Sequence, residues 1–285
     1  MRVVVTGVNG QLGYDVVKEL EKHGLTAFGL TRKDLDITDK DQVIRTIRDI
    51  NPEAVINCAA YTAVDLAEEE KEETLSANAL AASYLAIACA GIHAKMIYLS
   101  TDYVFSGEGE KPYEVCDQVA PINWYGQTKY EGEQAVIREL DSCFIVRVSW
   151  VFGKNGKNFV KTMLRLSEER NTVSVVADQI GSPTYTVDLA KCLVAMIKTD
   201  KYGIYHVTNE GFCSWYDFAK EIFRMSGKNT TVQPLTSDEF PTKAKRPKNS
   251  RLSKEKLTEQ GFERLPTWQD ALSRYLYELQ AENLE

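Results

Sequence analysis

The sequence predicts an α/β protein built on a doubly wound parallel sheet, to which a smaller α/β substrate-binding domain is attached. Short β-branched runs alternate with stretches of helical periodicity through the first half of the chain. Strands separated by helices imply a parallel sheet with right-handed crossovers. A glycine-rich turn also follows the first run and opens the first helix, with glycines at positions 7, 10 and 13.

Five strands are expected in this half, at residues 2–6, 26–30, 54–58, 95–100 and 143–148. The helices between them have recognisable ends. The first has apolar residues at helical spacing and Gly24 at its end. Thr38 is expected to cap the second, and Asn51-Pro52 to end it. An alanine-rich helix at 78–90 and a helix at 125–140 complete the series.

The second half is less regular. We expect an amphipathic helix at 159–169, a helix at 187–197, a strand at 204–207, a helix from the cap Ser214 to Met225, and a terminal helix at 268–279. The helix at 187–197 is expected to return to the sheet. Two discontinuous domains follow from this pattern: residues 1–152 and 183–208 for the cofactor, and residues 153–182 and 209–285 for the substrate.

Composition excludes several classes of protein. The 285 residues carry a net charge of −7, which argues against a general nucleic-acid binder. The six cysteines form no Cys-x-x-Cys pair and the three histidines lie far apart, so no zinc site is expected. Free thiols suit a reducing cytosol. The N-terminus runs directly into a strand, and no apolar run reaches the roughly 20 residues that span a bilayer. We therefore expect a cytoplasmic protein.

The turn containing Gly7, Gly10 and Gly13 lies between a strand and a helix, the context of a dinucleotide-binding fingerprint in a Rossmann-type sheet. Glycines let the backbone approach a pyrophosphate, and the helix N-terminus offers free N–H groups to it. A tight turn with packing glycines and no ligand is the plainer interpretation.

The end of the second strand indicates which cofactor binds. NAD-specific sites usually place a carboxylate there for the ribose 2′-hydroxyl. This chain instead has Arg32, which suits a 2′-phosphate, so NADPH is predicted, with NADH as an alternative. Solvent exposure of Arg32 is the competing explanation. Asp36 and Ile37 are expected beside the adenine. The small residues Ala59 and Ala60, with Tyr61, are expected beside the cofactor's ribose and nicotinamide.

Tyr125 and Lys129 lie four residues apart, on one face of a helix. An ammonium beside a phenol favours the phenolate, so the tyrosine pKa is expected to fall from about 10 toward neutrality. Such a group donates a proton to a carbonyl or alkoxide oxygen. Ser100, Thr101 and Asp102 end the fourth strand, at the edge where open α/β sheets bind ligands. Thr101 is the better candidate for the cleft, because strand alternation points only one hydroxyl there.

A basic loop stands out in an acidic chain: Lys243, Lys245, Arg246, Lys248 and Arg251. One interpretation is a clamp for a diphosphate. The other is a solvated loop.

These residues lie in eight motifs that resemble one family. They are TGVNGQLG (6–13), AAYTAVD (59–65), STDYVF (100–105), YGQTK (125–129), RVSWVFG (147–153), ADQIGSPT (177–184), SWYDF (214–218) and AKRPKNS (244–250). The chain resembles the dTDP-4-dehydrorhamnose reductase family of the extended short-chain dehydrogenases/reductases, over nearly its whole length. The resemblance implies hydride transfer from NADPH to C4 of dTDP-4-keto-6-deoxy-L-mannose, in the last step of dTDP-rhamnose biosynthesis.

The resemblance also implies roles for single residues. Tyr125 would donate the proton, Lys129 would hold the nicotinamide ribose, and Thr101 would tune the hydrogen bond at the keto oxygen. Ser100 would contribute to the cofactor site. The pyrophosphate would lie against residues of the first turn, Gly10, Gln11 and Leu12. The substrate would contact Thr62, Val64, Thr101, Asp102, Tyr125, Trp150 and Arg246.

Some relatives dimerise through carboxylates that share a magnesium ion. Asp15 and Asp188 match such positions, but Val187 interrupts the acidic pair. No metal is predicted, and the expected state is a monomer or a weak homodimer without nucleic-acid or membrane partners.

Two alternatives remain open. One is a sugar-nucleotide dehydratase or epimerase of the same superfamily. Dehydratases commonly need an Asp-Glu pair after the threonine, whereas Tyr103 follows Asp102 here. The other is a non-catalytic subunit, like the regulatory subunit of methionine adenosyltransferase, which resembles this family. A scaffold has no need of Thr101, Tyr125 and Lys129, so catalysis is favoured.

Overall fold

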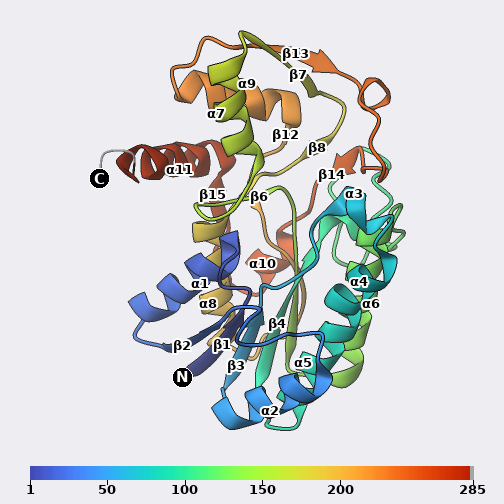
Figure 1. Ribbon diagram of the computed structural model, residues 1–285, viewed down its shortest axis with the longest axis vertical. Helices are drawn as coiled ribbons and strands as arrows, with labels where there is room; N and C mark the ends of the chain where they lie inside the picture. Colours follow the sequence, from blue (N-terminus) through green and yellow to red (C-terminus); the bar gives the residue numbers. More distant parts are fainter. Residues whose placement is uncertain (283–285) are drawn as a thin grey trace.

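The structure is a computed structural model that describes residues 1–282. A parallel sheet of six strands, in the order β10-β5-β4-β3-β1-β2, forms its lower half (Figure 1). The strands are β1 (Arg2–Thr6), β2 (Thr26–Leu30), β3 (Ala54–Asn57), β4 (Lys95–Thr101), β5 (Cys143–Val148) and β10 (Gly203–His206). The predicted doubly wound sheet is confirmed. The strand order reverses between β1 and β3, at the carboxyl edge where ligands bind in such sheets.

Strand alternation divides the core into two layers. Val3 and Val5 point to one face of the sheet, which is covered by α1 (Gln11–Lys22) and α8 (Thr186–Ile197). Val4 points to the other face, which is covered by α2 (Lys40–Ile50), α5 (Ala81–Ala90) and α6 (Trp124–Glu139). Both faces are therefore buried, which explains why these strands are continuous apolar runs.

The upper half in Figure 1 is assembled from later segments. Three helices, α7 (Phe159–Glu169), α9 (Trp215–Met225) and α11 (Trp268–Glu282), surround an aromatic core with β7 (Thr172–Val176) and β13 (Thr231–Leu235). Short pairings complete it: β6 (Val151–Phe152) with β9 (Thr184–Tyr185), β8 (Ile180–Gly181) with β12 (Cys213–Ser214) and β14 (Asn249–Ser250), and β11 (Asn209–Glu210) with β15 (Leu265–Thr267). The remaining helical turns are α3 (Val64–Ala67), α4 (Lys71–Leu75), η1 (Ser76–Leu80), η2 (Asp102–Val104), η3 (Ser237–Glu239) and α10 (Glu255–Glu259).

Helix ends follow side-chain chemistry, with one correction. Ser214 caps α9 as predicted, in a reciprocal capping box with Asp217. The predicted cap Thr38 is wrong. Asp39 caps α2 by accepting the Gln42 N–H, while the Thr38 hydroxyl donates to Asp36 at 2.7 Å. Both residue types cap helices well, so the sequence alone did not separate the two neighbours.

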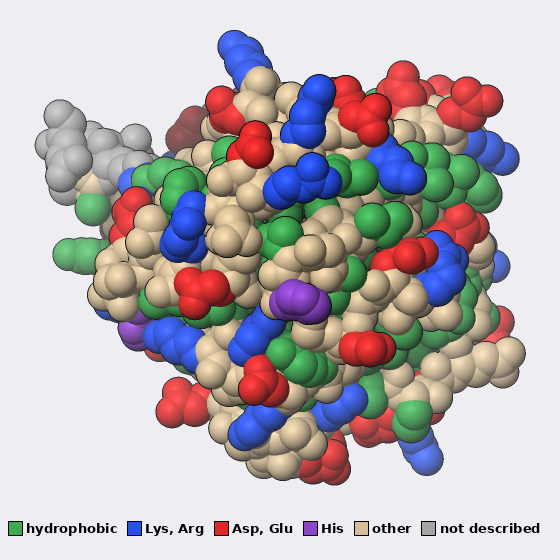
Figure 2. Space-filling view, turned by 90° about the horizontal axis from the view of Figure 1, so that it is seen from below, with side chains coloured by type: hydrophobic (Ala, Val, Ile, Leu, Met, Phe, Trp, Pro, Cys, Tyr) green, Lys and Arg blue, Asp and Glu red, His purple; other side chains and the backbone are tan. Residues whose placement is uncertain are grey.

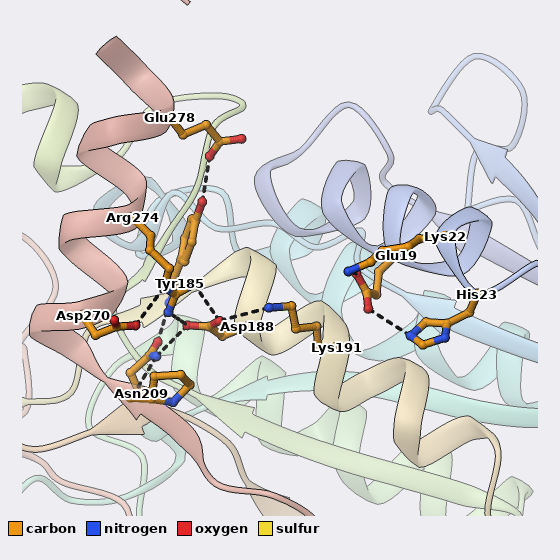
Figure 3. A network of polar contacts seen from close by, with 11 residues as sticks. Glu19, Lys22, His23, Tyr185, Asp188, Lys191, Asn209, Asp270, Arg274 and Glu278 are labelled. Carbon is orange, nitrogen blue, oxygen red and sulfur yellow. Dashed lines mark hydrogen bonds and ion pairs between the residues drawn. The ribbon is translucent and has the colours of Figure 1, made fainter. Parts of the chain in front are cut away.

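The terminal helix α11 is joined to α8 by a polar network (Figure 3). Arg274 donates to both oxygens of Asp188, at 2.9 and 2.6 Å, although only 3% of the Asp188 side chain is exposed. Asn209 also donates to Asp188, and Tyr185 donates to Glu278. The carboxylate of Asp188 is thus satisfied by protein donors.

No helix within residues 1–282 combines the length and the apolar character needed to cross a membrane. On the face seen from below, acidic and basic side chains are interspersed (Figure 2). That face therefore offers no broad field of one sign to a polyanion.

Candidate active site

The glycines of the first turn allow close backbone packing and leave the N-terminus of α1 open. Gly7 has φ +68°, and a Cβ there would lie 2.8 Å from the Ala59 nitrogen. A Cβ at Gly13 would lie 2.5 Å from the Gly7 oxygen. Gly10, the N-cap of α1, has no capping side chain, and the first turn has no acidic residue. The N–H groups of Gln11 and Leu12 are therefore in place for an anion.

The side chains of that first turn have structural roles. The Gln11 Oε1 accepts hydrogen bonds from the Gly153 N–H at 2.9 Å and from Asn158 Nδ2 at 3.0 Å. Leu12 packs in the core beneath the sheet. Their backbone N–H groups therefore remain for a pyrophosphate, because the Gln11 oxygen and the Leu12 side chain have protein partners.

A pocket of about 540 Å³ opens beside this turn. It is lined by predicted cofactor residues, namely Gly7, Arg32, Asp36, Ile37, Ala59, Ala60 and Tyr61. Arg32 is exposed, and among described residues no carboxylate forms an ion pair with it. Asp36 accepts from Thr38, whose hydrogen bonds lower the Asp36 pKa and keep it ionised. The size of this pocket, the exposed guanidinium of Arg32 and the uncapped N-terminus of α1 together fit a phosphorylated dinucleotide such as NADPH.

Tyr125 and Lys129 lie on α6, whose N-cap Asn123 accepts the Gly126 N–H at 2.8 Å. The predicted fall of the Tyr125 pKa is wrong for this structure. Burial raises the Tyr125 pKa instead, with the charge of Asp102 adding to the rise and a hydrogen bond to Thr101 opposing it. The four-residue spacing correctly placed Tyr125 and Lys129 on one face of a helix. It contained no information about how deeply the two side chains are buried.

Lys129 is itself buried, with 3% of its surface exposed. Its ammonium lies 4.2 Å from the centre of the Tyr98 ring. Burial lowers the Lys129 pKa to about 7, against an opposing effect of the Glu133 charge. The lysine therefore changes charge close to neutral pH, while the tyrosine keeps its proton there.

Thr101 and Asp102 lie next to Tyr125 at the end of β4. The Thr101 hydroxyl hydrogen-bonds with Tyr125, donates to Asp102 Oδ1 and accepts the Tyr103 N–H. Burial raises the Asp102 pKa to about 7, against the opposing effect of hydrogen bonds from Ser250 and Thr101. Ser100 points elsewhere, since its hydroxyl donates to the buried carboxylate of Glu133. Thr101 is thus the hydroxyl beside the tyrosine, as alternation predicted.

A buried ion pair under the site was not predicted. Arg147 donates to both oxygens of Glu133, at 2.8 and 2.7 Å, with 2% and 0% of the two side chains exposed. It connects β5 to the helix that holds Tyr125. Glu133 follows Tyr125 and Lys129 at the same four-residue interval, which was the available sequence signal.

A larger cleft of about 1610 Å³ extends over the upper half. It is lined by Tyr103, Trp215, Phe240 and cationic residues of the basic loop, including Arg246. Trp150 does not line the cleft. Its indole stacks on Trp215, and Trp215 does line the cleft. Thr62 and Val64 line neither pocket: Thr62 is exposed, and Val64 begins α3.

The carboxylates considered for a metal are paired otherwise. Asp15 accepts from the Thr186 hydroxyl, and Asp188 is held by Arg274. Among residues 1–282, no three His, Cys, Asp or Glu side chains gather as a set of metal ligands.

Known proteins resemble this chain over nearly its whole length. A family model described as "RmlD substrate binding domain" matches residues 1–281. The spore coat polysaccharide biosynthesis protein SpsK of Bacillus subtilis is 40% identical over 277 residues, covering 97% of each chain. The dTDP-4-dehydrorhamnose reductase of Aggregatibacter actinomycetemcomitans is 42% identical, covering 95% of this chain and 97% of the relative. A crystal structure of dTDP-4-dehydrorhamnose reductase from Bacillus anthracis in complex with NADP superposes with a TM-score of 0.95, at 45% identity over 97% of this chain and 99% of that one.

Proposed function

The chain belongs to the RmlD substrate binding domain family, and from this premise we propose that it is an NADPH-dependent dTDP-4-dehydrorhamnose reductase. It reduces dTDP-4-dehydro-β-L-rhamnose to dTDP-L-rhamnose, the final step of dTDP-rhamnose biosynthesis. The observation on which the proposal chiefly rests is the cluster of Thr101, Tyr125 and Lys129 at the carboxyl edge of the sheet. That cluster lies on β4 and α6, at the same carboxyl edge of the sheet as the uncapped glycine turn.

NADPH, when bound, supplies the hydride. The residues that would hold it are the turn at Gly7–Gly13 for the pyrophosphate, Arg32 for the 2′-phosphate and the pocket around Ile37 and Ala59 for the adenosine side. The free N–H groups of α1 and the exposed guanidinium supply opposite charge to the two phosphate positions.

Tyr125 donates a proton to the substrate oxygen. Its raised pKa keeps the phenol protonated at neutral pH, which is the state a donor needs before the oxygen becomes basic. Thr101, hydrogen-bonded to that phenol, is placed to share the oxygen. When protonated, Lys129 would stabilise the phenolate left after the transfer, because opposite charges attract strongly at a buried site. The substrate's diphosphate would lie toward Arg246, with its sugar near Trp150, Thr62, Val64 and Asp102.

We further propose that residues 1–152 and 183–208 serve the cofactor, and that residues 153–182 and 209–285 serve the sugar nucleotide. The protein acts in the cytoplasm as a monomer or weak homodimer. Size-exclusion chromatography with light scattering tests the oligomeric state.

One assay tests the activity. Purified protein is mixed with NADPH and dTDP-4-dehydro-β-L-rhamnose, and cofactor oxidation and dTDP-L-rhamnose are measured together. A reductase gives one product per cofactor consumed. A dehydratase or epimerase changes the sugar without net cofactor consumption, and a non-catalytic subunit changes neither.

A further inference from the structure

The basic loop, residues 241–251, is fixed to the sheet-bearing half by charge pairs. Lys243 pairs with Glu69, and Arg246 pairs with Asp65. Both carboxylates come from the segment that follows β3, one on α3 and one just beyond it. Asn123, the cap of α6, also donates to the Lys245 carbonyl at 2.8 Å. The loop therefore lies across the cleft in a defined position.

The pair between Asp65 and Arg246 differs from the other loop pairs in geometry. Nη1 and Nη2 of Arg246 donate to the two oxygens of Asp65, at 3.1 and 2.8 Å. The same carboxylate accepts the Ala244 N–H at 3.1 Å, so it binds the loop backbone as well. The Lys243–Glu69 pair has one contact between side chains that are 59% and 56% exposed, whereas Arg246 and Asp65 are 26% and 40% exposed. Only the Asp65 pair has the bidentate form that fixes a guanidinium plane.

Arg246 has donors beyond those bonded to Asp65, and Nη1 also donates to the Ala244 carbonyl at 3.4 Å. A guanidinium has five N–H donors, and Asp65 takes one from each Nη. Arg246 also hydrogen-bonds with the Tyr103 phenol, and the Tyr103 ring meets Tyr125 edge-on with centroids 5.7 Å apart. Tyr103 and Arg246 both line the large cleft. Asp65 occupies the Nη1–Nη2 end of the guanidinium, so the edge left for a ligand in the cleft is the side that carries Nε and the second Nη2 hydrogen.

We propose that Asp65 is a positioning residue that holds Arg246 ready for the substrate's diphosphate. The inference rests on the proposed function, in which the basic loop receives that group. A free arginine side chain loses rotamer freedom when it binds a phosphate. The contact with Asp65 removes this freedom during folding, so binding of the diphosphate loses less entropy. Asp65 also fixes Ala244, so backbone and side chain of the loop are set together.

The test compares Asp65→Asn, Arg246→Ala and the matched control Glu69→Gln, which neutralises the carboxylate that pairs with Lys243 of the same loop. We expect Asp65→Asn to raise the substrate KM about tenfold, the scale of a lost charge-assisted hydrogen bond. Its kcat should stay within about twofold of the unmutated protein, because a diphosphate contact made equally in the bound substrate and the transition state affects KM alone. Its Kd for NADPH should also stay within about twofold, because the loop does not line the cofactor pocket. Glu69→Gln should leave the substrate KM within about twofold, as exposed pairs contribute little.

A second readout separates positioning from a general loss of loop structure. Inhibition by dTDP and by thymidine is measured in each variant. If Asp65 positions Arg246, the Asp65→Asn variant should be inhibited less strongly by dTDP, while its inhibition by thymidine should not change. An equal loss of inhibition by dTDP and by thymidine would contradict the positioning role of Asp65. If Arg246→Ala raises the substrate KM but Asp65→Asn does not, the inference about Asp65 is wrong and the diphosphate contact stands. If neither variant changes the KM, the proposed diphosphate contact itself fails.

Discussion

The indole of Trp150 stacks on that of Trp215, with ring centroids 3.7 Å apart and 15° between the ring planes. Trp150 does so from a left-handed backbone with φ 49°, a conformation that costs roughly 1–3 kcal/mol outside glycine. The stack joins the segment after β5 to the first residue of α9, and Trp215 lines the large cleft. The strained backbone of Trp150 is thus maintained at the border of the candidate substrate site.

Replacement of Trp215 by alanine should weaken substrate binding. Trp215 lines the cleft, and an aromatic contact with a bound ligand contributes about 0.5–1.5 kcal/mol, so loss of the ring should raise the substrate KM by roughly 2–10-fold. The Kd for NADPH should not change, because the stack lies outside the cofactor pocket. Trp215→Phe, which keeps an aromatic ring, should recover part of the loss. An alanine variant with unchanged KM would show that the stack has no role in substrate binding.

Tyr125→Phe tests the proton donor. Only a hydroxyl is lost, so the fold and NADPH affinity should persist while turnover falls by roughly 10²–10⁴. Tyr130→Phe is the matched control, because Tyr130 lies on the same helix and packs against the small core of Val104 and Phe105. Single-turnover kinetics of both variants provide the comparison. Near-normal turnover in Tyr125→Phe would remove this residue from the mechanism.

Arg32→Ala tests cofactor choice. NADPH should bind more tightly than NADH to the unmutated protein, and the variant should lose about 1.5–3 kcal/mol toward NADPH only. Lys33→Ala is the neighbouring control, since Lys33 is exposed and does not line the pocket. Titration of each protein with both cofactors measures the effect. Equal affinity of the unmutated protein for NADPH and NADH would contradict the assignment of Arg32.

The buried Lys129 should make stability depend on pH. Its pKa is about 7 in the folded protein and 10.5 as the reference value, so between these limits the unfolded chain binds more protons. The free energy of unfolding should therefore rise as pH increases from about 7 toward 10.5. Asp102, with its pKa raised to about 7, acts in the opposite direction below pH 7. Urea unfolding at pH 7 and pH 9 should show a smaller rise for Lys129→Met. An identical rise in both proteins would be incompatible with a buried lysine.

The pair of Arg274 with Asp188 should stabilise the contact between α11 and α8. Arg274→Met leaves Asp188 buried without its main donor, while Asn209 and the more distant Lys191 remain. Because Arg274 is 36% exposed, we expect a loss of about 2–3 kcal/mol, below the usual range for a fully buried pair. The exposed pair of Arg165 with Glu169 supplies the control, since Arg165→Met should cost under about 1 kcal/mol. Equal losses in the two variants would show that burial of Asp188 is unimportant.

The sequence predicted the parts of the fold that depend on local pattern. The bounds of β1, β2 and β5 and the cap of α9 at Ser214 agree with the structure, because apolar runs and capping chemistry are read within a few residues. The prediction of Thr38 as the N-cap of α2 was wrong, because its neighbour Asp39 caps a helix equally well and takes that position.

The sequence predicted site residues that lie within one motif on one helix or strand. It did not predict contacts between side chains that are far apart in the chain. Arg246 pairs with Asp65, 181 residues away, and no periodicity connects them. The direction of the Tyr125 pKa shift failed for a related reason, since depth of burial is a property of the whole fold. Trp215 was part of a quoted motif, but only the ring geometry identifies its contact with Trp150.

The most direct test of the central claim is the fate of an isotopic label. NADPH carrying deuterium at the transferred position of the nicotinamide is incubated with the protein and dTDP-4-dehydro-β-L-rhamnose, and the product sugar is examined by NMR. We predict deuterium at C4 of dTDP-L-rhamnose, with one deuteron per cofactor oxidised. Product formed without deuterium at C4, or no product despite bound NADPH, would contradict the assignment of this chain as a reductase of that sugar nucleotide.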